Sequence, residues 1–305
     1  MTCDGEAHWY LSVKYTRDPS GAVSASQELY IDKILKRWGM ESCKPLPTPF
    51  PAKSDVVLDE LLKPIENPDP VLNKQFHSWC VSILARFTTK AGAPHMALAK
   101  KVLRYLQGRK RIPLRWCARS CQQPHLPGHI YGYADASFAD IKPDRLSNMG
   151  YVFIINNGAV SWRSTRTHLV TLSAAESEII ALSAATQEAV YLRKLANELG
   201  FTQSSPTLYE DCTAAVVLSK ENRFRRSKHI ALRRSFVSER QHPSVGDIQV
   251  ISVTRKIMLA DIFASPRPAA SFIPFRDSLL GCTSRITPLD SRDASTPDDD
   301  ASLDE

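Results

Sequence analysis

Apolar residues recur every three or four positions between residues 173 and 200, the spacing of one face of an α-helix. Ser173 stands at the position of an N-cap, and Glu176, three residues later, supplies the other half of a capping box. Gly200 follows the last apolar position and suits a left-handed C-cap. The predicted helix is the element around which we arrange the rest of the chain. Its stripe consists of Glu178, Leu182, Ala185, Ala189, Leu192, Ala196 and Leu199.

Glu178 is the exception on this stripe, because it is a carboxylate at a position that should face the core. Burying a charge is costly unless the charge is paired or binds a metal ion. Glu176 lies off the stripe and has a sufficient role as a capping residue. Glu178 is therefore the glutamate for which we expect a chemical function.

The N-terminal third of the chain predicts two strands, three helices and a proline-rich connector. Residues 8–18 alternate, a turn follows at 18–21, and 22–27 form a second candidate strand. Helical spacing is found at 28–40, 76–87 and 94–107, while the prolines between 44 and 70 predict little regular structure.

From residue 129 onward the pattern is that of a βββαβα unit. Residues 129–137, 150–155 and 159–164 predict a three-stranded meander, and the long helix follows it. Further elements are expected at 207–212 (strand), 213–220 and 231–240 (helices), 247–253 (strand) and 256–264 (helix). After Pro266 no further domain is predicted.

Composition adds a strong charge asymmetry to this picture. The 305 residues carry a net charge of +7, but residues 289–305 contain seven acidic residues and Arg292 alone, which leaves +13 on residues 1–288. A basic body suggests a polyanionic partner. The acidic tail, poor in apolar residues, is predicted to be disordered. The absence of long apolar runs, of a signal-peptide pattern and of a cysteine framework indicates an intracellular protein, cytoplasmic or nuclear, that is not secreted and has no membrane partner.

Four residues of zinc-ligand type stand four positions apart before this unit: Cys117, Cys121, His125 and His129. Pro124, Pro127 and Gly128 would break a helix there, so a looped metal site is one reading and a variable linker is the other. The spacing matches no common zinc motif, and the linker is favoured.

Four carboxylates occupy distinctive positions on the βββαβα pattern. Asp135 lies in the first strand, Glu178 on the helix stripe, Asp211 at the end of the strand 207–212 and Asp261 in the last helix. Hard oxygen ligands suit Mg²⁺ or Mn²⁺, and closely spaced acids need a cation if they are to ionise together. An isolated Asp near a strand end is more often a turn residue, so the prediction rests on the set of four.

Residues 129–264 resemble the ribonuclease H domain that closes the Pol polyprotein of copia-type retrotransposons. The resemblance rests on GYADAS (132–137), GYVF (150–153), AVSWRS (159–164), LSAAESEIIALS (172–183), LYED (208–211), SKHI (227–230) and LADIF (259–263). Upstream, YIDKILKRWGM, CKPLPTPF, LARF and AKKVLRYLQG are similar to the end of the reverse transcriptase and its connection region. The domains implied are a reverse-transcriptase remnant (1–43), a connector (44–128), a ribonuclease H-like domain (129–265) and a disordered acidic tail (266–305).

The resemblance implies an α/β fold, a ribonuclease H-like mixed five-stranded sheet flanked by helices, preceded by a partial reverse-transcriptase thumb and connection segment. It implies hydrolysis of the RNA strand of RNA–DNA hybrids at a two-metal site built from Asp135, Glu178, Asp211 and Asp261, with the rest of a Pol polyprotein as a further partner. Candidate phosphate contacts, against the alternative of a solvated loop, are Arg223, Arg225, Arg226 and Lys228.

The sequence departs from the family pattern around these motifs. Other residues are usual where Ser137, Cys212, Ala231, Ser235 and Met258 stand, and the polymerase's paired-Asp motif is absent. We therefore expect no polymerase activity. The alternative to an active ribonuclease H is an inactive retrotransposon remnant that at most binds nucleic acid.

Overall fold

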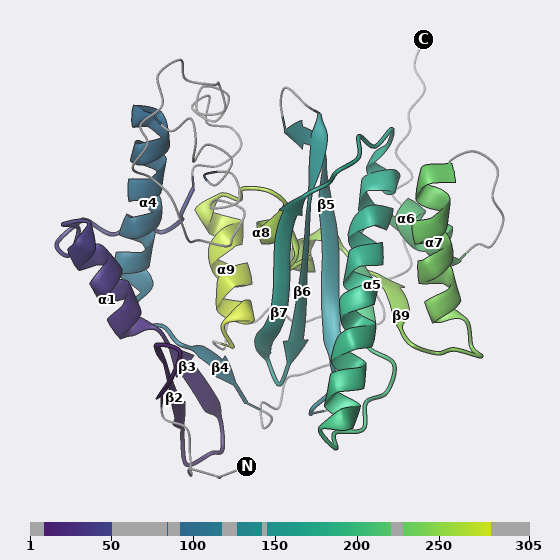
Figure 1. The fold of residues 1–305 in the computed structure, drawn as a ribbon, viewed down its shortest axis with the longest axis horizontal. Helices are drawn as coiled ribbons and strands as arrows, with labels where there is room; N and C mark the ends of the chain where they lie inside the picture. Colours follow the sequence, from purple (N-terminus) through teal and green to yellow (C-terminus); the bar gives the residue numbers. More distant parts are fainter. Residues whose placement is uncertain are drawn as a thin grey trace.

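A mixed five-stranded sheet forms the centre of the second half of the chain (Figure 1). In this computed structural model the described residues are 9–50, 84, 92–117, 127–141, 145–220 and 228–281. The sheet contains β5 (Tyr131–Ile141), β6 (Leu146–Ile155), β7 (Gly158–Arg166), β8 (Thr207–Glu210) and β9 (Gln249–Ser252), in the order β7-β6-β5-β8-β9. The meander β5-β6-β7 is antiparallel, whereas β8 pairs parallel to both β5 and β9. The predicted mixed sheet and its meander are confirmed.

Helices cover both faces of this sheet (Figure 1). One face packs against α5 (Ala174–Glu198), α6 (Thr213–Lys220) and α7 (Lys228–Gln241), through a cluster that includes Phe153, Leu182 and Leu208. The opposite face is covered by the segment 257–263 and by α9 (Ala269–Leu279), around Tyr133, Val152 and Met258. Side chains alternate between the two clusters along β5, as strand geometry requires. The core thus lies in two layers, one on each side of the sheet.

The helix α5 begins and ends as its sequence predicts. The Ser173 hydroxyl accepts a hydrogen bond from the Glu176 amide at 3.2 Å, and Gly200 adopts a φ of +84°. The first half of α5 is buried on most sides, because the sheet and α7 enclose it. The apolar stripe of α5 becomes exposed to solvent toward the C-terminal end of the helix, where Leu199 is 66% exposed.

A smaller antiparallel sheet precedes the central one. It consists of β1 (Trp9–Tyr10), β2 (Val13–Arg17), β3 (Val23–Ser26) and β4 (Leu114–Trp116), in that order. Two helices, α1 (Glu28–Arg37) and α4 (Ala93–Arg109), contact each other beside it, and an ion pair of 2.7 Å links Lys110, at the C-terminal end of α4, to Asp32 in the middle of α1. The predicted strand 22–27 and these two helices are confirmed, whereas residues 8–18, predicted as one strand, form the antiparallel pair β1 and β2 with a turn at Leu11 and Ser12.

The strand β4 attaches this smaller sheet to the central one. Its Arg115 amide donates to the Leu280 carbonyl at 2.9 Å, and its Trp116 Nε1 donates to the Ala159 carbonyl of β7 at 3.2 Å. Arg115 also pairs with Asp18, in the turn between β2 and β3, at 2.6 Å. A Cβ on Gly158 would lie 2.8 Å from Trp116 Nε1, so glycine is required for this close approach.

Two further expectations from the sequence are corrected by the structure, and one strand is additional to them. The predicted helix 256–264 is a 3₁₀ turn, η1 (Arg255–Ile257), followed by a short helix α8 (Asp261–Ala264). Disorder from residue 266 is wrong for 269–279, which form α9 with Phe275 and Leu279 buried. The strand β4 was not predicted at all. The predicted helix 76–87, apart from Leu84, and the acidic tail 289–305 lie outside the described residues.

Candidate metal centre

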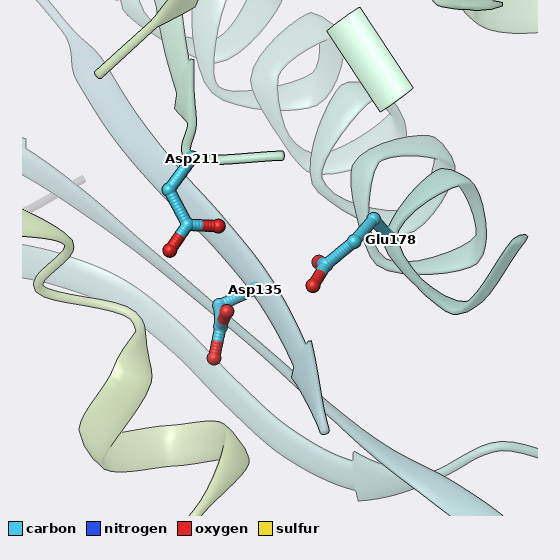
Figure 2. Close-up of side chains that lie close together, drawn as sticks. All are labelled: Asp135, Glu178 and Asp211. Atoms are coloured by element: carbon cyan, nitrogen blue, oxygen red, sulfur yellow. The ribbon is translucent and has the colours of Figure 1, made fainter. Parts of the chain in front are cut away.

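Three carboxylates from distant parts of the sequence converge beside the central sheet. Asp135, Glu178 and Asp211 each offer an oxygen, and these oxygens all lie within 4.8 Å of one another. Figure 2 shows the three side chains pointing toward one another, from β5, from the first turns of α5 and from the residue that follows β8. Hard oxygen donors at this separation form a site that fits Mg²⁺ or Mn²⁺.

The register of the parallel pair β5–β8 brings the two aspartates together. Tyr131 pairs with Thr207 and Tyr133 with Tyr209, so the same offset, carried two residues further, sets Asp211 beside Asp135. Asp211 follows β8 directly and is partly exposed, whereas Asp135 lies within β5 and is 5% exposed. Adjacent parallel strands in the interior of the sheet therefore place both carboxylates side by side, where β8 ends.

Glu178 reaches the same place from α5. Its side chain is 6% exposed, and its Oε2 atom is buried without a hydrogen-bond partner. Glu176 is instead a capping residue, since its carboxylate accepts a hydrogen bond from the Leu172 amide at 2.8 Å. Glu178, not Glu176, joins the cluster, as the phase of the helical stripe predicts. A buried, unpartnered carboxylate oxygen beside two further acids is what a cation-binding site requires.

The fourth predicted carboxylate, Asp261, lies close by but is held differently. It is the first residue of α8, is 1% exposed, and forms an ion pair with Arg267. The charge of Asp261 raises the pKa of Asp135 and of Asp211, so it is near both. Asp261 does not belong to the group of three carboxylates whose oxygens lie within 4.8 Å of one another.

Glu210 is a buried acid that the sequence analysis missed. It is fully buried, with its Oε1 accepting a hydrogen bond from the Cys212 amide at 3.2 Å and its Oε2 unpartnered. The alternation of side chains along β8 could have indicated the burial of Glu210. Leu208 packs in the apolar cluster beneath α5, and a residue two positions later on a strand points to the same side. Glu210 is a carboxylate at a core-facing position of a strand, just as Glu178 is a carboxylate at a core-facing position of a helix.

Burial and mutual repulsion make these acids hard to ionise. Desolvation raises the pKa of Asp135, Glu178 and Glu210 well above the ordinary values, and that of Asp211 less strongly. Repulsion adds to this, chiefly from Asp261 on Asp135 and from Glu210 on Glu178. A divalent cation would offset both effects, since it favours the charged form of every carboxylate around it.

We expect the metal-free protein to lose stability as the pH rises. A carboxylate whose folded pKa lies above its unfolded value of about 4 contributes its full stability below that value. The contribution is lost as the pH rises through the folded pKa, so with chelator the melting temperature should fall above about pH 4, and magnesium should restore it near pH 7.

The variant Glu210→Gln provides the control for this pH dependence, because it removes one buried acid outside the group of three and can keep the contact with the Cys212 amide. Its melting temperature with chelator should fall less steeply with pH than that of the wild type. Parallel curves for the two proteins would contradict the assignment.

The other sequence candidates are only partly visible. Arg223, Arg225 and Arg226 lie outside the described residues, and Lys228 begins α7 without a described side chain. Cys121 and His125 also lie outside the described residues, so the preference for a linker over a metal site at Cys117, Cys121, His125 and His129 stays a prediction. His129 Nδ1 forms a hydrogen bond with the Ser204 hydroxyl at 3.0 Å. No helix within the described ranges has the length and hydrophobicity needed to cross a bilayer.

Comparison with solved structures finds ribonucleases H. RNase H1 from Halobacterium salinarum shares 18% identity, covering 45% of this chain and 95% of that one, with a TM-score of 0.32. The N-terminal RNase H domain of a Mycobacterium tuberculosis protein shares 14%, covering 48% and 97%, with a TM-score of 0.35. LC11-RNase H1, solved in complex with an RNA/DNA hybrid, shares 13%, covering 44% and 92%, with a TM-score of 0.34. Scores at this level do not establish a common function, and the fold is defined by the strand order and directions given above.

Comparison with curated proteins finds transposon sequences, while no family model matches. The retrovirus-related Pol polyprotein from transposon TNT 1-94 of Nicotiana tabacum is 28% identical over 287 residues, 88% of this chain. That from transposon RE1 of Arabidopsis thaliana is 28% identical over 295 residues, 93% of this chain. The chain spans only 21% and 19% of their lengths.

A shorter match is to the secreted RxLR effector protein 161 of Plasmopara viticola, 39% identical over 112 residues, which make up 37% of this chain and 75% of that protein. The chain and that protein belong to one family over this stretch. The two long matches extend well beyond the central sheet, since they cover 88% and 93% of this chain. Over about nine tenths of its length, this chain is related to the Pol polyproteins of copia-type retrotransposons.

Proposed function

We propose that this chain carries a metal-dependent ribonuclease H site, which hydrolyses the RNA strand of RNA–DNA hybrids within a retrotransposon Pol polyprotein. The observation that supports this proposal most directly is the convergence of Asp135, Glu178 and Asp211, with the buried Glu178 Oε2 left without a partner. The mixed sheet and the similarity to Pol polyproteins point the same way.

The residues present fit one or two divalent ions, Mg²⁺ or Mn²⁺. Asp135, Glu178 and Asp211 would hold the first, and Asp261 with Asp135 or Asp211 would contribute to a second. When bound, such ions activate water and stabilise the charge that develops on the phosphate. The chain's own residues orient these ligands: β5 and β8 fix the two aspartates by register, and the Ser173 cap fixes the start of α5.

The substrate class follows from the same proposal. An RNA–DNA hybrid is recognised mainly by its groove shape and its 2′-hydroxyl groups, together with contacts to the phosphates. The +13 charge of residues 1–288 favours a polyanion of this kind. Arg223, Arg225, Arg226 and Lys228 remain the proposed phosphate contacts.

A second candidate function is nucleic-acid binding without catalysis. The observation that favours it is the Arg267–Asp261 ion pair, since it occupies a carboxylate that a two-metal site needs. The two candidates make different predictions for cleavage.

The test is cleavage of an RNA–DNA hybrid in magnesium or manganese by wild type, Glu178→Gln and Glu176→Gln. Removing the Glu178 charge takes away a metal ligand whose electrostatic contribution is several kcal/mol, so cleavage should fall about 10²–10³-fold. Glu176→Gln is the matched control on the same helix and should cleave like wild type, because Glu176 is a capping residue.

Equal cleavage by Glu178→Gln and wild type would contradict the site assignment. Absence of hybrid cleavage by the wild type in either metal, with salt-sensitive hybrid binding retained, would support the binding-only alternative. Cleavage of duplex DNA at the same rate as the hybrid would instead overturn the substrate class.

A further inference from the structure

Arg267 lies against the acidic site and holds its fourth carboxylate. Its Nη2 pairs with an oxygen of Asp261, whose side chain is 2% exposed, while the Arg267 side chain is 20% exposed. The Arg267 Nε and Nη2 are both buried without a hydrogen-bond partner, and so is the Asp261 Oδ1. The guanidinium is thus largely desolvated, and its contact with Asp261 is an ion pair.

The loop that carries Arg267 is constrained on both sides. Pro266 and Pro268 flank the arginine, and each fixes its own φ. The residue before a proline is confined to extended conformations, which applies to Arg267 itself. Pro268 is the N-cap of α9, whose Phe275 and Leu279 are buried in the core on that face of the sheet. The arginine is therefore presented to the site by a short segment that has little freedom to move away.

The charge of Arg267 acts on the metal-site acids as well as on Asp261. It lowers the pKa of both Asp135 and Asp211, against the upward shift caused by burial. A permanent positive charge thus stands among these acids, in the region where a second divalent ion would have to bind through Asp261. Arginine is never neutral in proteins, so this charge is present at every working pH.

We propose that Arg267 guards the second cation position of the acidic site, so that one divalent ion binds readily through Asp135, Glu178 and Asp211 while a second binds only by displacing Arg267 from Asp261. This inference rests on the proposed function, because it assumes that the three acids bind metal. It assigns to Arg267 the control of how many ions the site holds at a given metal concentration.

Titration of the whole, substrate-free protein with Mn²⁺, followed by calorimetry, tests this directly. The wild type should bind one ion tightly and a second more weakly. Arg267→Gln should tighten the second ion about 10–100-fold, because it removes a fixed positive charge that competes with the ion for Asp261 in a poorly solvated site. Arg267→Gln combined with Asp261→Asn should bind a single ion, with the affinity of the first wild-type ion.

Arg255→Gln is the matched control. Arg255 is exposed, stands in η1, and also lowers the pKa of Asp211, so the substitution removes an equal charge from the neighbourhood of the site. It should leave the second affinity near that of wild type. If it tightens the second ion as much as Arg267→Gln does, general electrostatics explains the effect and the guarding role is overturned.

Other outcomes separate this inference from the proposed function. Two equally tight ions in the wild type, or an unchanged second ion in Arg267→Gln, would overturn the inference alone. Absence of any Mn²⁺ binding that depends on Asp211 would overturn the metal site and this inference together. Should Arg267→Gln fail to fold without metal, Arg267→Lys replaces it. A lysine lacks the guanidinium fork, so the second ion should still bind more tightly than in wild type, and an unchanged affinity would again overturn the guarding role.

Discussion

Asparagine in place of Asp211 is expected to abolish hybrid cleavage while leaving the metal-free protein at least as stable as wild type. Loss of a metal ligand should reduce cleavage about 10²–10³-fold. The metal-free stability should not fall, because Asp211 lies beside Asp135 and within the field of Asp261, and its neutralisation removes like-charge repulsion. Melting curves with chelator and with magnesium measure the second effect, and magnesium should stabilise the wild type more than the variant.

A carboxylate with an ordinary structural role should respond in the opposite way. Asp247 accepts from Arg193 at 3.0 Å and from Arg240 at 2.9 Å, so Asp247→Asn should lower stability with or without magnesium. If Asp211 were merely a turn or capping residue, its substitution would also lower stability, by about 0.5–2 kcal/mol. A destabilised Asp211→Asn, together with a wild type that magnesium does not stabilise, would rule out the metal centre.

The largest structural effect is expected from Gly150→Ala. Gly150 pairs with Asp135 across β5 and β6, and α8 crosses directly over it. An added Cβ would lie 2.9 Å from the Phe263 carbonyl carbon and 3.1 Å from the Ala264 nitrogen, with the Phe263 Cβ closer still. The helix cannot easily yield, because the Phe263 carbonyl accepts from Asn148 Nδ2 at 3.0 Å and from Ser164 Oγ at 2.7 Å.

We therefore expect Gly150→Ala to destabilise the protein by about 3 kcal/mol, the upper end of the usual range for overpacking. The melting temperature should fall by about 5–10 °C. Ala214→Ser, which adds one atom at an exposed position of α6, serves as the control and should melt near wild type. An unchanged melting temperature for Gly150→Ala would mean that α8 does not pack on β6 in this way.

The parts of this structure that could be predicted are those whose signal is local and periodic. The stripe of α5 revealed Glu178 because a helix repeats every 3.6 residues and one charged residue broke the pattern. The three-stranded meander was recognisable from its β-branched and aromatic residues. The positions of the four predicted site acids on the βββαβα pattern already suggested one metal-binding set, and the resemblance gave the same four. The register that pairs β5 with β8 and brings Asp211 beside Asp135 is, however, a long-range contact that the sequence does not show.

The parts that could not be predicted depend on long-range contacts. The strand β4 has three residues, too few for a period to show, and it exists because β3 pairs with it. The helix α9 was missed because prolines precede it and Pro274 lies inside it, and both features argue against a helix. The Arg267–Asp261 ion pair could not be inferred either, since nothing in the spacing of six residues indicates that the intervening chain turns back.

The strand β4 has a practical consequence for dividing this chain into independently folding pieces. A cut at residue 129, where the sequence pattern changes, would remove Arg115 and Trp116 from their contacts with Leu280 and Ala159. The edge of β7 beside Gly158 would then lose its cover, and exposed strand edges are sites of aggregation. A shorter protein intended to keep the central sheet soluble should begin before β4, near residue 112. Even then, β4 would lack its partner β3, so a shorter protein that keeps every strand paired should also include the small N-terminal sheet.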